Sequence, residues 1–346
     1  MDNATIRTRP RPECPTCSSS GQVLYEEWVD RILGLPGSWR WKQCNDKRCG
    51  TLWQDPVTVD EDLWKLYINY PTHEGGQEGT KSRGFAQHLR DAVRNEYLYT
   101  RYGYASSSPR WLRPFLASIA YLHPAWRDTQ AASVFYLPAV PGGTVLDVGC
   151  GNGSSLRALE QRGWRGIGVD FDPVAVDVAR SLGTDARVGE LESQKFPEGF
   201  FDAIIMSHVI EHVPCAKALL QECRRILKEG GVLIAITPNA ASRGHQKYCK
   251  DWRGFEPDHL QIFTPQALKA LGAETGFSSV RSFSSLQGVD YLLDASEGLM
   301  RYGHPEPPTR TGLYEKLAKQ LRWFVLGWLH ILHPGRDEVA VLSCKK

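Results

Sequence analysis

Runs of apolar residues in the second half of the chain alternate between the spacing of strands and the spacing of helices. A β-branched run at 144–148 leads into a glycine-rich turn, a helix expected over 154–162 and a second strand at 166–170. Two later segments repeat the strand and helix pattern: FFDAIIMSHVIEHV at 200–213 and LLQECRRILKEGGVLIAITPN at 219–239. This order predicts an α/β fold built from β-loop-α-β units.

The carboxyl-terminal part adds two expected strands and a long insertion between them. One strand is expected at 278–284 and another at 337–344. The connection between them exceeds an ordinary loop and contains an apolar helix at 313–332. Three interpretations of this helix stay open: a lid packed over a pocket, a contact with a membrane surface, or an oligomer contact. Its longest apolar run, at 321–332, is too short to span a bilayer.

The middle of the chain, at 59–139, is aromatic and helical in tendency. Apolar residues of 85–99 recur on one face, which predicts an amphipathic helix. Breaks rich in Gly, Ser and Pro at 74–79 and 105–109 indicate connections. We expect this region to be a helical linker or lid.

Composition limits the classes of function. The chain has 346 residues, with 41 Lys and Arg against 39 Asp and Glu, so its net charge is only +2. This balance disfavours a nucleic-acid partner, which requires many uncompensated cations. The first residues lack the apolar stretch of a secretory signal, and we expect a cytoplasmic protein. An odd number of cysteines, nine, disfavours a disulfide framework.

Four of the cysteines form two closely spaced pairs near the start. Cys14 and Cys17 are followed after 26 residues by Cys44 and Cys49, with strand-like segments between the pairs. This spacing predicts a structural zinc site in a ribbon that spans 1–58. Four thiolates leave no open coordination position, so a catalytic zinc is not expected.

The glycine-rich turn after 144–148 predicts a nucleotide-binding loop. Its glycines allow a ligand to approach the backbone closely, and a carboxylate that ends the next strand can bind both hydroxyls of a ribose. An acidic residue directly before the loop would repel a pyrophosphate, but it suits a ligand that carries an ammonium or a sulfonium. The residues concerned are Asp147, Gly149, Gly151, Gly153 and Asp170.

The passage LDVGCGNGSSLRALEQRGWRGIGVDFDP resembles the class I S-adenosylmethionine-dependent methyltransferases, and the later segments follow in that family's order. The resemblance covers about 140–285 and implies a Rossmann-like, seven-stranded sheet. It also implies that Asp147 and the three glycines lie near the methionine and ribose, and that Asp170 binds the ribose. Glu190 and Leu191 would contact the adenine, and Ser207 or His208 would face the sulfonium.

The segment HVIEH after the fourth expected strand carries the candidate catalytic chemistry. His208, Glu211 and His212 lie three and four residues apart, and they resemble a Glu-x-x-Glu-His segment of ubiquinone-type and small-RNA methyltransferases that, with a later His, can hold a divalent metal. His259 would match that later His, and His208 replaces the first Glu. Three interpretations stay open: a second divalent metal, a metal-free site with His212 or His259 as general base, or a structural role.

Taken together, these features predict a bacterial S-adenosylmethionine-dependent methyltransferase domain at 140–346, with a helical insertion at about 286–335. The expected acceptor is a hydroxyl of a sugar, a glycolipid or a related metabolite, including nucleotide sugars and lipid-linked sugars. Alternatives are C- or N-methylation of a nucleotide sugar or natural-product precursor, RNA ribose methylation, and a cofactor-binding adaptor without activity. Peripheral contact with the inner face of a membrane fits a lipid-linked acceptor. A long loop at 239–254 supplies Arg243, Lys247, Lys250 and Arg253, which are candidates to bind an acidic group of the substrate.

Overall fold

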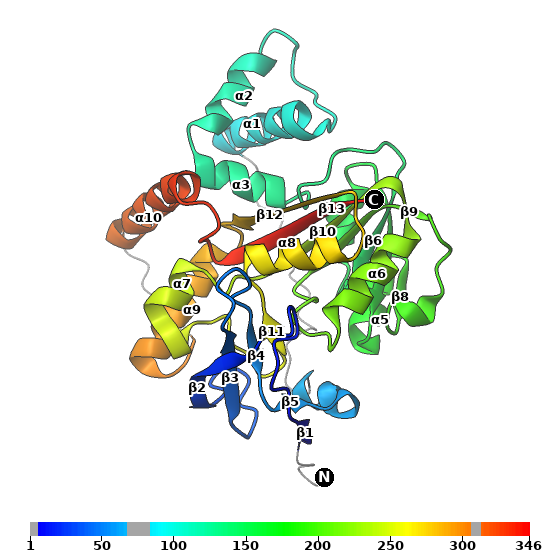
Figure 1. The fold of residues 1–346 in the computed structure, drawn as a ribbon. Coiled ribbons are helices and arrows are strands. Elements are labelled where there is room, and N and C mark those ends of the chain that lie inside the picture. The colour runs from blue at the N-terminus through cyan, green and yellow to red at the C-terminus, as the bar shows by residue number, and fades with distance from the viewer. Residues whose placement is uncertain (1–5, 68–83, 306–312) are drawn as a thin grey trace.

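The computed structural model describes residues 6–67, 84–305 and 313–346. Its centre is a seven-stranded sheet with the order β12-β13-β10-β9-β6-β7-β8 (Figure 1). The strands are β6 (Thr144–Val148), β7 (Arg165–Asp170), β8 (Ala186–Val188), β9 (Phe201–Ser207), β10 (Leu227–Pro238), β12 (Ser279–Ser285) and β13 (Val339–Lys345). The five strands from β6 to β10 pair in parallel, and β13 lies antiparallel between β10 and β12. The predicted Rossmann-like sheet is confirmed.

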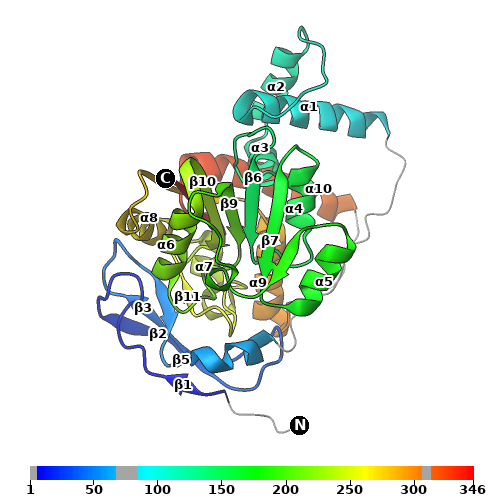
Figure 2. The same cartoon turned by 90° about the vertical axis from the view of Figure 1, so that its right-hand side faces the viewer.

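Helices cover both faces of the sheet because its central strands are apolar on both sides. Consecutive residues of β9, Ile204 and Ile205, enter two different hydrophobic clusters, and Ile234 and Ala235 of β10 do the same. One face is covered by α6 and α8, and the other by α4, α5 and further helices of the middle region (Figure 2). These elements are α4 (Ser154–Glu160), α5 (Pro173–Ser181), η2 (Glu192–Gln194), α6 (Ala216–Ile226) and α8 (Pro265–Glu274). Two buried faces explain the near-continuous apolar runs in the sequence.

The front of the chain forms two small sheets. The strands are β1 (Thr8–Arg9), β2 (Gly21–Trp28), β3 (Trp39–Cys44), β4 (Leu52–Gln54), β5 (Val57–Thr58) and β11 (Gln261–Ile262). The larger sheet has the order β11-β4-β3-β2, so its fourth strand comes from a segment more than 200 residues later. A boundary at residue 58 therefore does not isolate this sheet.

Buried contacts join the front sheet to the rest of the protein. The side-chain amide of Gln54 donates hydrogen bonds to the carbonyl oxygens of Pro257 and His259, each at 2.9 Å. The hydroxyl of Thr264 donates to the carbonyl oxygen of Cys49 at 2.6 Å. An aromatic cluster then closes the gap between β2, β3 and the segment after β10; it includes Trp28, Trp39, Trp41, Trp252 and Phe255. The front sheet and the segment 252–264 thus share one core.

The remaining helices belong to the middle region, to the segment after β10 and to the insertion between β12 and β13. They are η1 (Asp60–Tyr67), α1 (Phe85–Tyr102), α2 (Arg113–Tyr121), α3 (Pro124–Ala132), α7 (Arg243–Tyr248), η3 (Cys249–Asp251), α9 (Val289–Tyr302) and α10 (Leu313–Leu332). Helix α10 crosses α3 where a Cβ at Gly327 would lie 2.8 Å from the backbone nitrogen of Ala125. Arg322 of α10 forms ion pairs with Asp290 and Asp294 of α9 at 2.6 and 2.7 Å.

Within the described ranges, each helix is too short or too polar to cross a membrane, as the sequence led us to expect.

We expect Gln54→Ala to destabilise the protein because the change leaves two buried carbonyl oxygens without their donor. The free energy of unfolding should fall by about 1–3 kcal/mol, measured by urea denaturation. Gln22→Ala, on an exposed position of β2, is the matched control and should change little. Equal unfolding midpoints for the two variants would contradict this account of how the front sheet is attached.

The pair formed by His330 of α10 and Asp337 before β13 should make stability depend on pH. Their side chains lie 2.7 Å apart. Burial alone would lower the pKa of His330, but the hydrogen bond with Asp337 and the charges of Asp128 and Asp337 raise it overall. A raised pKa in the folded state stabilises the protein fully below pH 6.5, the ordinary value, and this contribution is lost as pH rises through the raised value.

The test compares urea midpoints of the wild type and His330→Gln at pH 6 and pH 9. The stability difference between the two proteins should shrink at pH 9, because the wild type then loses the charged pair. Other titrating groups are common to both proteins and cancel. A difference that is the same at both pH values would show that His330 does not titrate against Asp337.

Candidate functional site

The glycine-rich loop after β6 is held open by a carboxylate from the next strand. Gly149, Gly151 and Gly153 all have positive φ, at +74°, +50° and +76°, a conformation that favours glycine. Asp170, at the end of β7, accepts hydrogen bonds from the backbone nitrogens of Gly151 at 2.8 Å and Asp172 at 2.9 Å. A Cβ at Gly151 would meet no atom within 4 Å, so the loop borders open space there.

Two buried carboxylates lie behind this loop. Burial raises the pKa of Asp147 well above its ordinary value, and the charge of Asp170 raises it further. Burial also raises the pKa of Asp170, against the hydrogen bonds from Asp172 and Gly151. A cationic group bound beside this pair would favour the ionised form of both acids, whereas a pyrophosphate would raise their pKa values further. The open loop and these two acids therefore fit the amino acid and ribose parts of S-adenosylmethionine.

The other residues assigned to the cofactor lie at the ends of neighbouring strands. The loop after β8 passes beside β7, because the Gly189 nitrogen donates to the carbonyl oxygen of Asp170 at 2.8 Å. On that loop Glu190 is exposed, while the side chain of Leu191 is buried in the core. Ser207 ends β9 and is half-buried. Figure 2 shows β6, β7 and β9 side by side in this part of the sheet.

His208 and Glu211 follow β9 and contact each other. His208 has a positive φ of +56°, and its Nδ1 lies 3.2 Å from Oε1 of the fully buried Glu211. Burial would raise the pKa of Glu211, but the hydrogen bond from His208 and the charges of nearby histidines lower it to about 2. Glu211 is therefore ionised, and its Oε2 has no hydrogen-bond partner.

His212 and His259 meet beside Glu211, as the sequence predicted for a shared site. Their rings pack edge to face with centroids 4.7 Å apart. Nδ1 of His212 lies 3.1 Å from the backbone oxygen of Asp258 and 3.3 Å from its carboxylate. Burial would lower the pKa of His212, but Asp258 and Glu211 raise it to about 9. Without a metal, His212 is protonated at neutral pH and is a poor base.

The structure gathers a ligand set that differs from the four residues expected. One ligand atom from each of Glu211, His212 and His259 lies within 4.8 Å of the others, whereas His208 is outside this group and contacts Glu211 instead. Glu256, Asp258 and His259 form a second such group. Buried oxygens of Glu211, Glu256 and Asp258 have no hydrogen-bond partner. Orphaned buried carboxylate oxygens are costly, and a divalent cation would satisfy them.

Sequence reasoning missed three residues of this site. Glu256 and Asp258 lie in the same short segment as His259, and their acidic character was the available signal. Tyr67 of η1 has its ring centroid 4.8 Å from that of Phe171, next to Asp170, and 6.0 Å from that of His212. The tyrosine thus contacts both the end of β7 and the histidine cluster. No local pattern in the sequence indicates this contact.

Two of the basic residues at 239–254 form ion pairs with acids of the protein itself. Arg243 pairs with Asp337 at 3.0 Å, and Arg253 pairs with Glu256. These pairs weaken the expectation that both arginines bind an acidic substrate group. Lys247 instead lies over the Tyr248 ring and lines a cavity of about 340 Å³ between α7, α9 and α10.

The four cysteines of the front sheet converge as their spacing predicts. The Sγ atoms of Cys14 and Cys49 lie 3.7 Å apart, those of Cys17 and Cys44 lie 3.4 Å apart, and all four are within 4.8 Å. A tetrahedral zinc with bonds of about 2.3 Å requires sulfur separations of about 3.8 Å. The thiolate cluster therefore fits a zinc ion.

The central part of the chain is similar to known methyltransferases. Residues 121–282 match the model of a family described as methyltransferase domain. A ubiquinone biosynthesis O-methyltransferase of Xanthomonas campestris pv. campestris (strain B100) is 38% identical over 125 residues, which are 34% of this chain and 51% of that protein. A probable S-adenosylmethionine-dependent methyltransferase of Mycolicibacterium smegmatis is 34% identical over 100 residues, 28% of this chain and 39% of that protein. The chain spans about half the length of the first of these relatives.

Solved structures with similar folds include a phosphoethanolamine N-methyltransferase 2 of Haemonchus contortus in complex with S-adenosyl-L-methionine. It is 14% identical with a TM-score of 0.44, and the match covers 85% of this chain and 62% of that one. A possible histamine N-methyltransferase of Thermotoga maritima is 20% identical with a TM-score of 0.43, covering 73% and 98%.

We expect Cys14→Ser to remove one zinc per chain and to destabilise the front sheet, because the site loses one of four thiolates. Elemental analysis by mass spectrometry measures the first effect and thermal melting the second. Cys215→Ser, an exposed cysteine outside the cluster, is the control. Full zinc content with an unchanged melting temperature in Cys14→Ser would show that these thiols are not metal ligands.

Proposed function

We propose that this chain, whose residues 121–282 match a family described as methyltransferase domain, transfers a methyl group from S-adenosylmethionine to a hydroxyl of a small molecule. A sugar, a glycolipid or a related metabolite is the proposed acceptor. The observation that carries the proposal is the contact between His208 and Glu211 directly beyond β9, next to the strand ends that would hold the cofactor.

The glycine-rich loop and its acids would bind the cofactor. The free lone pairs of the Asp170 carboxylate can accept from ribose hydroxyls while the same oxygens hold the Gly151 and Asp172 nitrogens. Asp147 would lie near the cationic amino acid part, and Glu190 with the backbone of Leu191 near the adenine. Bound S-adenosylmethionine supplies an electrophilic methyl group.

His208 is the proposed general base. When its Nδ1–H donates to the ionised Glu211, its Nε2 carries the lone pair that can take a proton from an acceptor hydroxyl. The side chain of His208 is 44% exposed, so an acceptor can reach it, whereas His212 and His259 are enclosed. Glu211 would hold the imidazole in this tautomer, as a carboxylate does in other catalytic pairs.

Glu211, His212 and His259 are the proposed ligands of a divalent cation, with Asp258 as a further carboxylate beside them. When bound, such a cation lowers the pKa of a coordinated hydroxyl. One carboxylate with two imidazoles suits Mn²⁺, Co²⁺ or Zn²⁺ better than Mg²⁺. Oε1 of Glu211 contacts His208, and Oε2 has no partner. One oxygen of this carboxylate can therefore accept from His208 while the other binds the cation.

The four cysteines of the front sheet would hold a structural zinc. We also propose that the protein is located in the cytoplasm. Similarity to ubiquinone biosynthesis O-methyltransferases supports O-methylation, so a hydroxylated precursor of ubiquinone belongs in the acceptor screen beside nucleotide sugars. Methylation at carbon or nitrogen is the alternative within the same enzyme class, and product analysis distinguishes it.

The test separates cofactor binding from methyl transfer. Calorimetric titration with S-adenosylmethionine should show binding at least tenfold weaker in Asp170→Asn, since a hydrogen bond to a charged group contributes about 1.5–3 kcal/mol. Asp177→Asn, an exposed acid of α5, should bind as the wild type does. In contrast, His208→Gln should bind the cofactor normally.

Transfer of a labelled methyl group is then measured with the acceptor panel and with small RNAs. We expect His208→Gln and Glu211→Gln to lose at least a hundredfold in rate, with the second also losing any bound Mn²⁺ or Co²⁺. Normal transfer by His208→Gln would contradict its role as base. Cofactor binding without transfer to any acceptor would favour the adaptor alternative.

A further inference from the structure

Helix α10 has two apolar faces, and only one of them meets the protein. The inner face packs on α3 at Gly327 and pairs with α9 through Arg322. On the outer face, Leu321, Phe324, Trp328 and Leu332 follow the spacing of one helical stripe and are between 44% and 65% exposed. A soluble helix ordinarily presents polar residues on that side.

A second exposed apolar stripe lies on α2 and its flanks. Trp111, Phe115 and Leu122 are spaced as neighbours along a helix, and each is at least 64% exposed. Leu122 precedes His123, whose ring lies 6.3 Å from that of Phe324 on α10. The two stripes therefore meet where α2, α3 and α10 come together.

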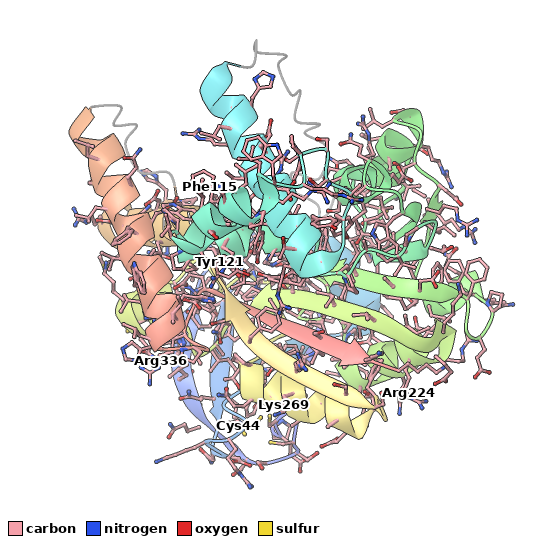
Figure 3. All side chains as sticks on the ribbon, turned by 90° about the horizontal axis from the view of Figure 1, so that it is seen from above. Cys44, Phe115, Tyr121, Arg224, Lys269 and Arg336 are labelled. Atoms are coloured by element: carbon pink, nitrogen blue, oxygen red, sulfur yellow. The ribbon has the colours of Figure 1, made fainter. Side chains whose placement is uncertain are left out.

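The figures show the position of this surface. Helices α1 and α2 project beyond the central sheet, with α10 below them on the same side (Figure 1). In the view from above, Phe115 and Tyr121 lie in the part of the molecule next to α10 (Figure 3). We call the exposed residues Trp111, Phe115, Leu122, Leu321, Phe324 and Trp328 the outer apolar face.

The two segments that carry this face contain basic residues but no acid. The segments 110–127 and 317–336 contain no Asp and no Glu, although the whole chain is almost balanced in charge. Arg110 and Arg336 are exposed at the two ends of these segments. Exposed tryptophans with arginines nearby are the composition of surfaces that lie at the boundary between lipid headgroups and acyl chains.

We propose that the outer apolar face docks on an anionic lipid bilayer. A second copy of the chain fits less well, because a symmetric contact brings the same patch of both copies together, and the segments 110–127 and 317–336 contain no acid that could pair with Arg110 or Arg336 of the other copy. Lipid phosphates supply the missing negative charge, and the acyl region accepts the aromatic side chains. This proposal is independent of the reaction proposed above.

The test is co-sedimentation of the full-length protein with vesicles. Vesicles of phosphatidylglycerol and phosphatidylcholine in equal parts should bind the protein at least tenfold more tightly than pure phosphatidylcholine vesicles, with weaker binding at high salt. The double variant Phe115→Ser, Trp328→Ser should lose at least tenfold of the affinity for the mixed vesicles. Trp64→Ser, an exposed tryptophan on η1, is the matched control and should bind as the wild type does.

Thermal melting and cofactor titration establish that the double variant is folded. If it is not, the two single variants replace it, and each should lose part of the affinity. Arg110→Ser with Arg336→Ser should reduce the preference for anionic vesicles. No binding to mixed vesicles, or equal binding by wild type and variants, would overturn the proposal. A dimer that the Phe115 and Trp328 substitutions dissociate, without vesicle binding, would assign the face to self-association and would also overturn it.

Discussion

The pairing of β11 with β4 is the constraint on which the site depends. Only two residues of each strand are in register, Gln261 with Trp53 and Ile262 with Leu52. Yet this short contact fixes the segment that carries Asp258 and His259, since Gln54 also holds the carbonyl oxygens around them. On the other side, the Leu260 nitrogen donates to the carbonyl oxygen of Glu211 at 3.0 Å. The front sheet therefore positions half of the proposed catalytic cluster.

This arrangement gives the cysteine cluster a role beyond its own module. Cys44 ends β3, and Cys49 lies three residues before β4, so a metal held by the four thiolates would fix the spacing of the two strands. Since β4 is the partner of β11, rigidity at the metal is transmitted to the histidine cluster by backbone hydrogen bonds and not by a flexible linker. A structural zinc could thus support catalysis without touching a substrate.

The sequence predicted what depends on local patterns. The strands β6, β7, β9 and β10, the loop at Gly149 and the convergence of the four cysteines all follow from runs, turns or spacings of a few residues. In contrast, a two-residue strand such as β11 has no readable period. The pairing of Arg243 with Asp337 and the placement of Tyr67 between Phe171 and His212 are contacts across 94 and more than 100 positions. Such contacts are set by tertiary packing, which a single sequence does not display.

Buried charged side chains are paired differently at α10 and at the proposed catalytic cluster. Arg322 and His330 of α10 pair with acids of α9 and of the segment before β13, whereas several large apolar side chains of the same helix stay exposed. At the proposed catalytic cluster, Glu211, Glu256 and Asp258 are buried, and each keeps at least one carboxylate oxygen without a hydrogen-bond donor. Each of these acids also contacts a basic side chain, so its charge is only partly compensated and some of its oxygens stay without a donor. A divalent cation would satisfy these oxygens, which supports the proposal that the loop after β9 and the segment before β11 together form a metal site.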